Sequence, residues 1–354
     1  MAASLQCSSS TPISSPMPNQ PSLLVFSGGT AFNGVVEELK NLTTRIAHVL
    51  PVSDDGGSTA EIVRVSRPYR ETIRAFLVYF QNEILRRPNE SFCFTNGSIG
   101  NFFFAGARIF FQSLDAAIFL FSRVSEIPPE SLVLPVISTN DRLTLGCELW
   151  DGTVIRGQNE ISHPTNGTMQ PVNKGCSSIP VLPSRMKRVF YMSSEGGNSL
   201  HEVFPAVNSS VLDQLSNVDC IVYAMGSLFT SICPSLVLRG VGEIISSRTC
   251  PKVLLLNGTH DRETSGFSAS CFVTAITDAL NRKYGDPHNC LENSPSQYIN
   301  TLLVPKEGEI PIDVPCLTSQ GIFDVIFVDS FRDPKVGIIF NPKSLINAIA
   351  NVVG

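Results

Sequence analysis

Apolar and polar positions near the start of the chain follow the rhythm of a parallel α/β protein. An apolar run at 23–26 breaks into the glycine turn SGGT at 27–30, and positions 33–40 then carry apolar residues at helical spacing. A second apolar run at 45–52 ends in the acidic, glycine-rich stretch SDDGGS at 53–58. Strands buried on both faces show such continuous apolar runs, so the pattern predicts a strand–helix–strand unit of a parallel sheet.

The second half of the chain continues the same rhythm. Apolar runs predict strands at 218–224, 252–256, 299–304 and 324–328, and helical spacing predicts a helix at 268–284. The run at 336–340 leads into a last helix that begins after Pro342. Between the two halves, runs at 132–137, 144–150 and 153–156 predict strands, with a tight hairpin turn at Asp151-Gly152. The predicted fold class is therefore α/β.

A phenylalanine-rich segment lies between these halves. Residues 92–121 hold nine of the 22 phenylalanines, and Asn101–Val124 is predicted to form one helix. Arg108, Gln112 and Asp115 interrupt its apolar sequence, so it falls short of the roughly 18–20 apolar residues that a membrane span needs. We therefore expect a buried core or interface helix and no membrane partner. Aromatic residues are enriched at protein interfaces, which makes a homodimer contact plausible.

The chain is expected to form a tail and one domain. The first 20 residues are rich in Ser and Pro and carry no Lys, Arg, Asp or Glu, so residues 1–20 are expected to be a disordered tail. A plastid transit peptide is the alternative, because the tail is Ser-rich and acid-poor, although it lacks arginine. Residues 21–354 are expected to form a single domain with a loop-rich insertion near 157–187, where Gly, Pro, Ser and Asn are frequent.

Composition and charge narrow the class of protein. Charged residues make up 16% of the chain, against a usual value of about 25%, which favours a sheet covered on both faces or an oligomer contact. The net charge of −5 and the lack of a basic stripe argue against a nucleic-acid partner. The ten cysteines form no CxxC pair, which is typical of reduced thiols in an intracellular protein. We expect a cytoplasmic protein, with a plastid location as the alternative.

The glycine turn after the first predicted strand has the composition of an anion site. Gly28 and Gly29 would let the backbone approach an anion closely, and the following helix offers free N–H groups and the positive end of its dipole. The turn matches neither a Walker A loop nor a full GxGxxG pattern. A plain strand–helix turn is the alternative.

The acidic stretch after the second predicted strand suggests a cation site. Asp54 and Asp55 repel one another, so a buried pair needs a counter-charge. Mg²⁺ would supply one, because it prefers one or two carboxylates together with substrate phosphates. A solvated acidic turn is the alternative.

Other loops place small polar residues next to predicted helices or strand ends. TNGSIGN at 95–101 precedes the phenylalanine-rich helix and suits phosphate or hydroxyl binding, although helix capping also explains part of it. MGSLFTS at 225–231 and NGT at 257–259 follow predicted strands, and ETSGFS at 263–268 precedes a predicted helix. Each of these has an ordinary strand-end loop as its alternative. No HExxH or GxSxG motif is present, which argues against a zinc site and a nucleophile-elbow hydrolase.

Taken together, these segments resemble the CofD / YvcK family. The resemblance is carried by SGGT at 27–30, DDGGS at 54–58, SIGN at 98–101, LPV at 134–136, GSLFTS at 226–231 and ETSGFS at 263–268. These six matches come in the order that the family has and cover roughly residues 22–345. The resemblance implies a Rossmann-like three-layer α/β/α fold with a mostly parallel sheet and a ligand crevice along the strand ends.

The resemblance also implies a function. CofD enzymes move a phospholactyl group from a guanosine diphosphate-linked donor to a deazaflavin alcohol with Mg²⁺. YvcK-like relatives are non-catalytic regulators that bind UDP-N-acetylglucosamine. The chain is therefore expected to be a Mg²⁺-dependent transferase of a phosphate-linked group, with a UDP-sugar-binding regulator as the alternative. Both would take a nucleotide-diphosphate-linked small molecule of the GDP or UDP type as partner.

By the same resemblance, residues of the matching segments receive roles. Asp54 and Asp55 would be catalytic and would hold the metal. The nucleotide and its phosphates would be bound by Gly28, Gly29, Thr30, Asn33, Gly226, Ser227, Thr230 and Ser231. The substrate would be bound by Ser58, Asn96, Ser98, Gly100 and Asn101.

The chain departs from the family pattern after DDGGS. Family members carry a Gly-Asp-x-Arg element and a helix there, whereas here Glu61–Val65 passes almost directly into SRPYR at 66–70. The comparison with the family pattern therefore predicts a missing segment near 65–70. Its loss puts catalysis in doubt more than the fold.

Overall fold

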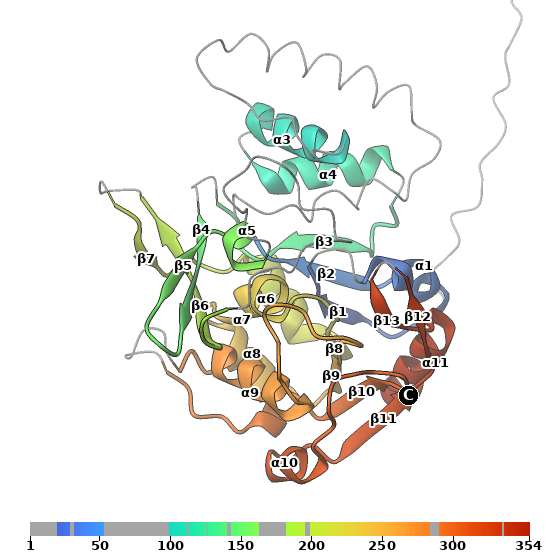
Figure 1. The fold of residues 1–354 in the computed structure, drawn as a ribbon. Helices are drawn as coiled ribbons and strands as arrows, with labels where there is room; N and C mark the ends of the chain where they lie inside the picture. The colour runs from blue at the N-terminus through green and yellow to red at the C-terminus, as the bar shows by residue number, and fades with distance from the viewer. Residues whose placement is uncertain are drawn as a thin grey trace, which may run out of the picture.

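The computed structural model describes residues 20–28, 32–52, 99–111, 113–125, 127–139, 143–162, 182–194, 199–283, 290–334 and 336–354. Its centre is a seven-stranded sheet in the order β11-β10-β9-β8-β1-β2-β3 (Figure 1). Every neighbouring pair in this sheet is parallel. The strands are β1 (Leu23–Phe26), β2 (Ile46–Leu50), β3 (Leu132–Pro135), β8 (Cys220–Tyr223), β9 (Lys252–Leu255), β10 (Thr301–Pro305) and β11 (Asp324–Val328).

Helices cover both faces of this sheet, which confirms the Rossmann-like three-layer prediction (Figure 1). One face is covered by α1 (Asn33–Leu42) and α11 (Pro342–Val353), which pack against one another. The other face is covered by α6 (Ser209–Asn217), α7 (Cys233–Leu236), α8 (Val241–Ser247) and α9 (Ala269–Leu280). The last of these helices ends before its predicted end at 284, and Arg282, with a φ of 50°, marks the change of backbone direction.

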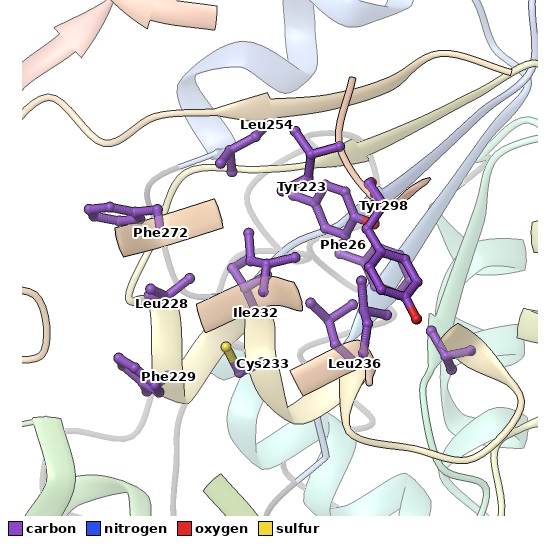
Figure 2. Close-up of a cluster of buried hydrophobic side chains, with 14 of the residues drawn as sticks. Phe26, Tyr223, Leu228, Phe229, Ile232, Cys233, Leu236, Leu254, Phe272 and Tyr298 are labelled. Carbon is purple, nitrogen blue, oxygen red and sulfur yellow. Dashed lines mark hydrogen bonds between the residues drawn. The ribbon is translucent and has the colours of Figure 1, made fainter. Parts of the chain in front are cut away.

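Alternation along the strands explains why the sheet is buried on both faces. In β1, Leu24 and Phe26 belong to the core under α6–α9, whereas Leu23 and Val25 belong to the core under α1 and α11. All four side chains are at most 1% exposed. Successive side chains of a strand point to opposite faces, so a strand covered on both sides must be apolar throughout. Figure 2 shows the larger core, in which Phe26 stacks on Tyr223 of β8 with ring centroids 5.7 Å apart.

A smaller antiparallel sheet stands beside the central one, in the order β5-β4-β6-β7. Its strands are β4 (Thr144–Leu149), β5 (Val154–Arg156), β6 (Met186–Ser193) and β7 (His201–Val203). The predicted hairpin between β4 and β5 is confirmed, and Gly152 in its turn has a φ of 86°. The sequence prediction missed β6 and β7. The segment 157–187, predicted to be loop-rich, contains the short helix α5 (Gln158–Ser162) and the first residues of β6, while 163–181 lie outside the described residues.

Two peripheral features complete the described fold. A hairpin of β12 (Ser330–Asp333) and β13 (Gly337–Phe340) follows β11, and α10 (Val314–Ser319) lies between β10 and β11 in the sequence. The expected single helix Asn101–Val124 is wrong, because the structure has two helices, α3 (Ile99–Phe111) and α4 (Leu114–Val124). Ser113 explains the break, since its hydroxyl accepts a hydrogen bond from the Ala116 N–H at 3.2 Å and so caps a new helix.

The helix pair α3–α4 forms its own apolar cluster. Phe103, Phe104 and Phe121 are buried in it, and Val133 of β3 packs against it. Phe110 and Phe119 are exposed, and whether a second copy covers them stays a prediction. Within the described part of the chain, no single helix has the length and apolar content to cross a membrane, and one pair bent by 81°, Leu228–Leu236 with Val241–Ser247, passes that test by length and composition.

Candidate functional site

The order of the central strands places a topological switch point between β1 and β8. From β1 the chain moves outward to β2 and β3, and it then returns to β8 on the other side of β1 before moving to β9, β10 and β11. Phe26 pairs with Tyr223, so both strands end at the same level. In open α/β sheets, ligands bind outside the carboxyl ends of the strands at such a point. The loops after Phe26 and Tyr223 are therefore the candidate site.

Two glycines bring these loops into close contact. A Cβ on Gly28 would lie 2.7 Å from the Cβ and 2.9 Å from the Cα of Ser231. A Cβ on Gly226 would lie 3.1 Å from the carbonyl oxygen of Gly28, and Gly226 has a φ of 149° that side chains disfavour. Both positions require glycine, for space at Gly28 and for backbone conformation at Gly226. The two segments predicted to bind phosphate thus meet directly at the switch point.

Asn257, from the loop after β9, fixes the backbone at Gly226. The Gly226 N–H donates to Asn257 Oδ1 at 3.0 Å, and Asn257 Nδ2 donates to the Gly226 carbonyl at 2.8 Å. This pair of hydrogen bonds ties the ends of β8 and β9 together. The residue after it, Gly258, is needed for packing, because a Cβ there would lie 2.1 Å from the carbonyl oxygen of Ile338 in β13. The NGT segment therefore contributes to the framework of the site.

A π-helical turn, Leu228–Ile232, follows Ser227 and runs into α7. The Ser231 N–H donates to the Ser227 carbonyl at 2.9 Å, which closes the first turn. Ser227 is half-buried, whereas Thr230 and Ser231 are buried. Turns of this type are rare and occur often at functional sites.

Behind this turn lies a buried carboxylate, Glu263, which is 3% exposed. Its Oε2 accepts hydrogen bonds from the Phe229 N–H at 2.8 Å and the Thr230 N–H at 3.1 Å. Its Oε1 accepts from the hydroxyls of Thr230 at 2.5 Å and Ser162 at 2.8 Å. The hydroxyl and N–H of Thr230 therefore already have an acceptor within the protein, and contact of Thr230 with a ligand stays a prediction.

Burial raises the pKa of Glu263 from its ordinary 4.5 to about 7, and the negative charge of Asp261 adds to the rise. The donors from Thr230, Ser162 and the Phe229 N–H act in the opposite direction and stabilise the carboxylate. Burial therefore favours the protonated form of Glu263, and its hydrogen-bond donors favour the ionised form.

Sequence reasoning missed the role of Glu263, although it named the ETSGFS segment that begins with this residue. The partners of Glu263 come from distant parts of the chain, with Ser162 on α5 and Thr230 on the π-helical turn. Arg262 also anchors α5, because its guanidinium donates to the carbonyls of Glu160 at 2.8 Å and of Ile161. Only the motif itself, an acidic residue in a strand-end loop before a helix, was a signal in the sequence.

On the other side of the switch point, α1 begins with an unsatisfied donor. The side-chain nitrogen of Asn33 is buried and has no hydrogen-bond partner within the described part of the chain. Phe32 precedes the helix without a side-chain cap, and the first turn carries no acidic residue. The free N–H groups and positive dipole end of α1, together with this amide, form a favourable environment for an anion.

The remaining predicted site residues fall into two groups. Gly100 and Asn101 lie in the first turn of α3. The others lie outside the described residues, namely Gly29, Thr30, Asp54, Asp55, Ser58, Asn96 and Ser98. Among the described ranges, no three His, Cys, Asp or Glu side chains form a group that could hold a metal ion. The predicted Mg²⁺ ligands are not part of those ranges, so the metal stays a prediction.

A cavity of about 610 Å³ lies away from the strand ends, between β6, β7 and the helices α6–α9. Phe229, Cys233 and Val237 line it. These three residues are spaced four apart, so they form one stripe along the π-helical turn and α7, and Ser231 lies off this stripe. The cavity and the switch-point site therefore use different sides of the same helical segment.

Comparisons with known proteins show which family the chain resembles. The family model described as 2-phospho-L-lactate transferase CofD matches residues 23–320. An uncharacterized protein of Saccharomyces cerevisiae is 26% identical over 85% of this chain and 94% of its own length. The gluconeogenesis factor of Halalkalibacterium halodurans is 29% identical over 72% of this chain and 73% of its own length, and that of Bacillus subtilis is 27% identical over 75% and 76%.

The fold also matches a solved structure. The crystal structure of a Bacillus halodurans protein of the UPF0052 family has a TM-score of 0.64 and 23% identity, and the match covers 93% of this chain and 98% of that one. The likeness supports the Rossmann-like architecture. Because the family model spans most of the sequence, including both glycine loops and the ETSGFS segment, the chain belongs to the CofD family.

Proposed function

We propose that the chain binds a nucleotide-diphosphate-linked small molecule at the switch point between β1 and β8 and transfers a phosphate-linked group from it to an alcohol. The close approach of Gly28 and Gly226 carries this proposal. This approach packs the two loops together at the carboxyl ends of β1 and β8, which is where open α/β sheets bind phosphates. The family model, named for a transferase, supports the same class of ligand.

The described residues suggest how the diphosphate would be held. Its negative charge would lie near the first turn of α1, which itself carries no acidic residue. The Asn33 amide, which has no partner within the described residues, would donate to a phosphate oxygen. Ser227 would present its hydroxyl from the opposite loop, because it starts the π-helical turn and is half-buried.

Transfer would depend on positioning and charge stabilisation, as in other phosphoryl-transfer sites. Asp54 and Asp55, which follow β2 in the sequence, would hold Mg²⁺. The metal would neutralise charge on the diphosphate when bound. One of the two carboxylates would orient the attacking hydroxyl of the alcohol and accept its proton. The hydroxyl oxygen would then bond to the transferred phosphorus as the bond from that phosphorus to the departing nucleoside monophosphate breaks in line.

A second function is favoured by the names of the curated relatives. The proteins from Halalkalibacterium halodurans and Bacillus subtilis are both called gluconeogenesis factor, and neither name is that of a transferase. On this alternative, the same crevice binds a UDP-sugar such as UDP-N-acetylglucosamine without chemistry, and the chain acts as a regulator. Both proposals use the same diphosphate site and differ in turnover.

One experiment separates the two. The purified protein would be denatured and any released nucleotide identified by mass spectrometry, and GDP and UDP-N-acetylglucosamine would then be titrated by calorimetry with and without Mg²⁺. Turnover of a diphosphate-linked donor that stops when EDTA removes Mg²⁺ supports the transferase. Tight binding of UDP-N-acetylglucosamine without turnover of any donor supports the regulator. Binding of neither nucleotide contradicts both.

A further inference from the structure

One buried carboxylate holds the turn that forms half of the switch-point site. Glu263 accepts four hydrogen bonds, two from the backbone N–H groups of Phe229 and Thr230 and two from hydroxyls. Each donor lies 2.5–3.1 Å from a carboxylate oxygen. The lone pairs of the carboxylate thus accept from the π-helical turn and from the Ser162 hydroxyl beside it.

Glu263 takes the place of a local cap for this turn. Ser227, which precedes it, makes no side-chain hydrogen bond to its first N–H groups. The first N–H groups of a helical turn lack intrahelical partners, and burying them without an acceptor is costly. Glu263 supplies that acceptor from a loop more than 30 positions later in the chain.

The same turn sets the shape of the site. Ser231 follows Thr230 directly, and its Cβ and Cα occupy the space against Gly28. Its N–H donates to the Ser227 carbonyl at 2.9 Å, so Ser227 and Ser231 move together. A shift of the N–H groups held by Glu263 would therefore move both serines relative to the glycine loop after β1.

We propose that Glu263 is the positioning residue of the nucleotide site, which it shapes by holding the turn Leu228–Ile232, and that binding of the diphosphate takes up a proton at this carboxyl group. This inference rests on the proposed function, because it assumes that the ligand at the switch point is a polyanion. Glu263 does not touch the ligand on this account. It acts through the backbone of Phe229 and Thr230.

The proton linkage follows from the surroundings of Glu263. Its carboxylate is buried, and its neighbours at the turn are neutral hydroxyl and N–H donors. A diphosphate beside the turn would repel the ionised form and leave the protonated form unaffected. By linkage, the ligand then raises the pKa of Glu263, and protonation in turn strengthens binding.

Other charged and titratable groups lie near Glu263. Asp261 and Arg262 lie in the loop of Glu263, and they contribute charges of opposite sign. Cys147 on β4 faces Glu263, and burial raises the pKa of its thiol to about 12. Burial also raises the pKa of Cys233 on α7 well above its ordinary value. Burial therefore favours the neutral form of both thiols, and His260 is a further titratable side chain in the loop of Glu263.

The positioning role can be tested without any ligand. Hydrogen exchange would be measured at the amides of Phe229 and Thr230 in the wild type, Glu263→Gln and Glu263→Ala. Glutamine keeps an oxygen for the two N–H groups, and its nitrogen can donate to the two hydroxyls, so protection should persist in Glu263→Gln. Protection should be lost in Glu263→Ala if that variant folds. Equal protection in all three proteins, or loss in Glu263→Gln alone, would overturn the positioning role.

The proton linkage is tested by the pH dependence of affinity. UDP-N-acetylglucosamine is the better probe, because its diphosphate is a diester without a phosphate group that titrates near pH 7. It is titrated without Mg²⁺, so that the two negative charges of the diphosphate are not neutralised. The dissociation constant for the wild type should rise by about tenfold between pH 6 and pH 8.5, the factor that corresponds to one pKa unit of linkage. The dissociation constant of Glu263→Gln should not change with pH, and it should equal the low value that the wild type has at pH 6. Glu37→Gln, which removes an exposed carboxylate from α1, should behave like the wild type.

The outcomes separate this inference from the proposed function. Binding with the same pH profile in the wild type and Glu263→Gln would overturn the inference alone. A profile that flattens in Glu37→Gln as well would assign the effect to overall charge and would also overturn it. Failure of the wild type to bind either GDP or UDP-N-acetylglucosamine at any pH would overturn the proposed function, and the inference with it.

Discussion

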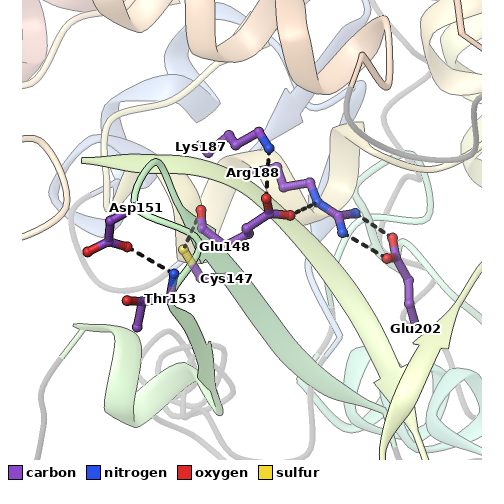
Figure 3. A network of polar contacts seen from close by, with 7 residues as sticks. All are labelled: Cys147, Glu148, Asp151, Thr153, Lys187, Arg188 and Glu202. Carbon is purple, nitrogen blue, oxygen red and sulfur yellow. Dashed lines mark hydrogen bonds and ion pairs between the residues drawn. The ribbon is translucent and has the colours of Figure 1, made fainter. Parts of the chain in front are cut away.

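Two carboxylates of this protein, Glu263 and Glu148, show how the partners of a charge decide its behaviour. Glu148, on β4, accepts hydrogen bonds from Lys187 and Arg188 of β6, each at 2.7 Å, and its side chain is 21% exposed (Figure 3). Arg188 also pairs with Glu202 of β7 at 2.6 Å. Glu263 is deeper in the protein, and its donors among the described residues are hydroxyls and backbone N–H groups.

The pKa values of the two groups move in opposite directions. Hydrogen bonds from Lys187 and Arg188 lower the pKa of Glu148 below its ordinary value, because both donors are cations. Burial raises the pKa of Glu263 to about 7, because its hydrogen bonds do not offset the loss of water. A cation-paired carboxylate near the surface contributes to the structure of a sheet. A carboxylate held by neutral donors in the interior is poised to respond to a nearby anion.

The largest effect is expected from removal of the buried group. Glu263→Ala leaves the N–H groups of Phe229 and Thr230 buried without an acceptor, and each such group costs about 1–3 kcal/mol, so the free energy of unfolding should fall by about 2–5 kcal/mol. Urea unfolding followed by circular dichroism measures this change. A loss no larger than that of an exposed control such as Glu37→Gln would contradict the account of a capped turn.

The pH dependence of stability should separate the two carboxylates next. The folded pKa of Glu263 lies above its ordinary 4.5, so its contribution to stability is fully present below about 4.5 and is lost as the pH rises toward about 7. The folded pKa of Glu148 is lowered, so its contribution is present above the ordinary value and is lost as the pH falls through the folded one. Urea unfolding at pH 4.5 to 8 measures the free energy of unfolding of the wild type and of Glu263→Gln. The difference between the two values should change with pH, because the wild type becomes less stable relative to Glu263→Gln as the pH rises. A constant difference would show that Glu263 titrates normally.

A smaller effect is expected where the glycine loops meet. A methyl group at Gly28 would overlap Ser231, and overpacking of this kind costs about 1–3 kcal/mol. Gly34, in the same segment but on the exposed face of α1, has no atom within 4 Å of an added Cβ. Gly34→Ala should keep or raise stability, by up to about 1 kcal/mol, because alanine favours helix. Thermal unfolding of both variants measures the contrast, and equal effects would mean that the two loops do not touch.

The smallest effect is expected at the partly exposed network of Figure 3. Glu148→Gln removes the ion pairs with Lys187 and Arg188 but keeps a polar side chain of the same shape. Partly exposed ion pairs contribute about 1 kcal/mol or less, so the free energy of unfolding should fall by no more than this, and the loss should shrink in 0.5 M salt. A loss as large as that of Glu263→Ala would remove the distinction between the two carboxylates.

The same comparison shows what the sequence could predict. Glu148 and Arg188 are direct cross-strand neighbours, so their pairing follows once β4 and β6 are known. The glycines at 28 and 226 were found from apolar runs that end in small residues, because strand ends of a parallel sheet meet at one edge. The contact of Ser162, Thr230 and Glu263 joins three segments that no local pattern connects, and it could not be predicted.

Other misses have local causes. The break between α3 and α4 depends on one serine cap within a segment whose apolar residues continue on both sides. The strand β6 was missed because it begins within the loop-rich segment 157–187, and β7 was missed because its three residues are too few to show a periodicity. The predicted roles of Asp54, Asp55 and the residues at 96–98 concern positions outside the described residues, so they stay predictions.

The central claim is that a nucleotide diphosphate binds where Gly28 and Gly226 meet. Its most direct test is a calorimetric titration of GDP and of UDP-N-acetylglucosamine, each with Mg²⁺, into the wild type, Gly28→Ala and Gly34→Ala. The account predicts that the wild type and Gly34→Ala bind one of these ligands with the same dissociation constant, and that Gly28→Ala binds it at least about tenfold more weakly, a loss of about 1.4 kcal/mol. Equal affinity of Gly28→Ala and the wild type, or no binding by any of the three, would contradict it.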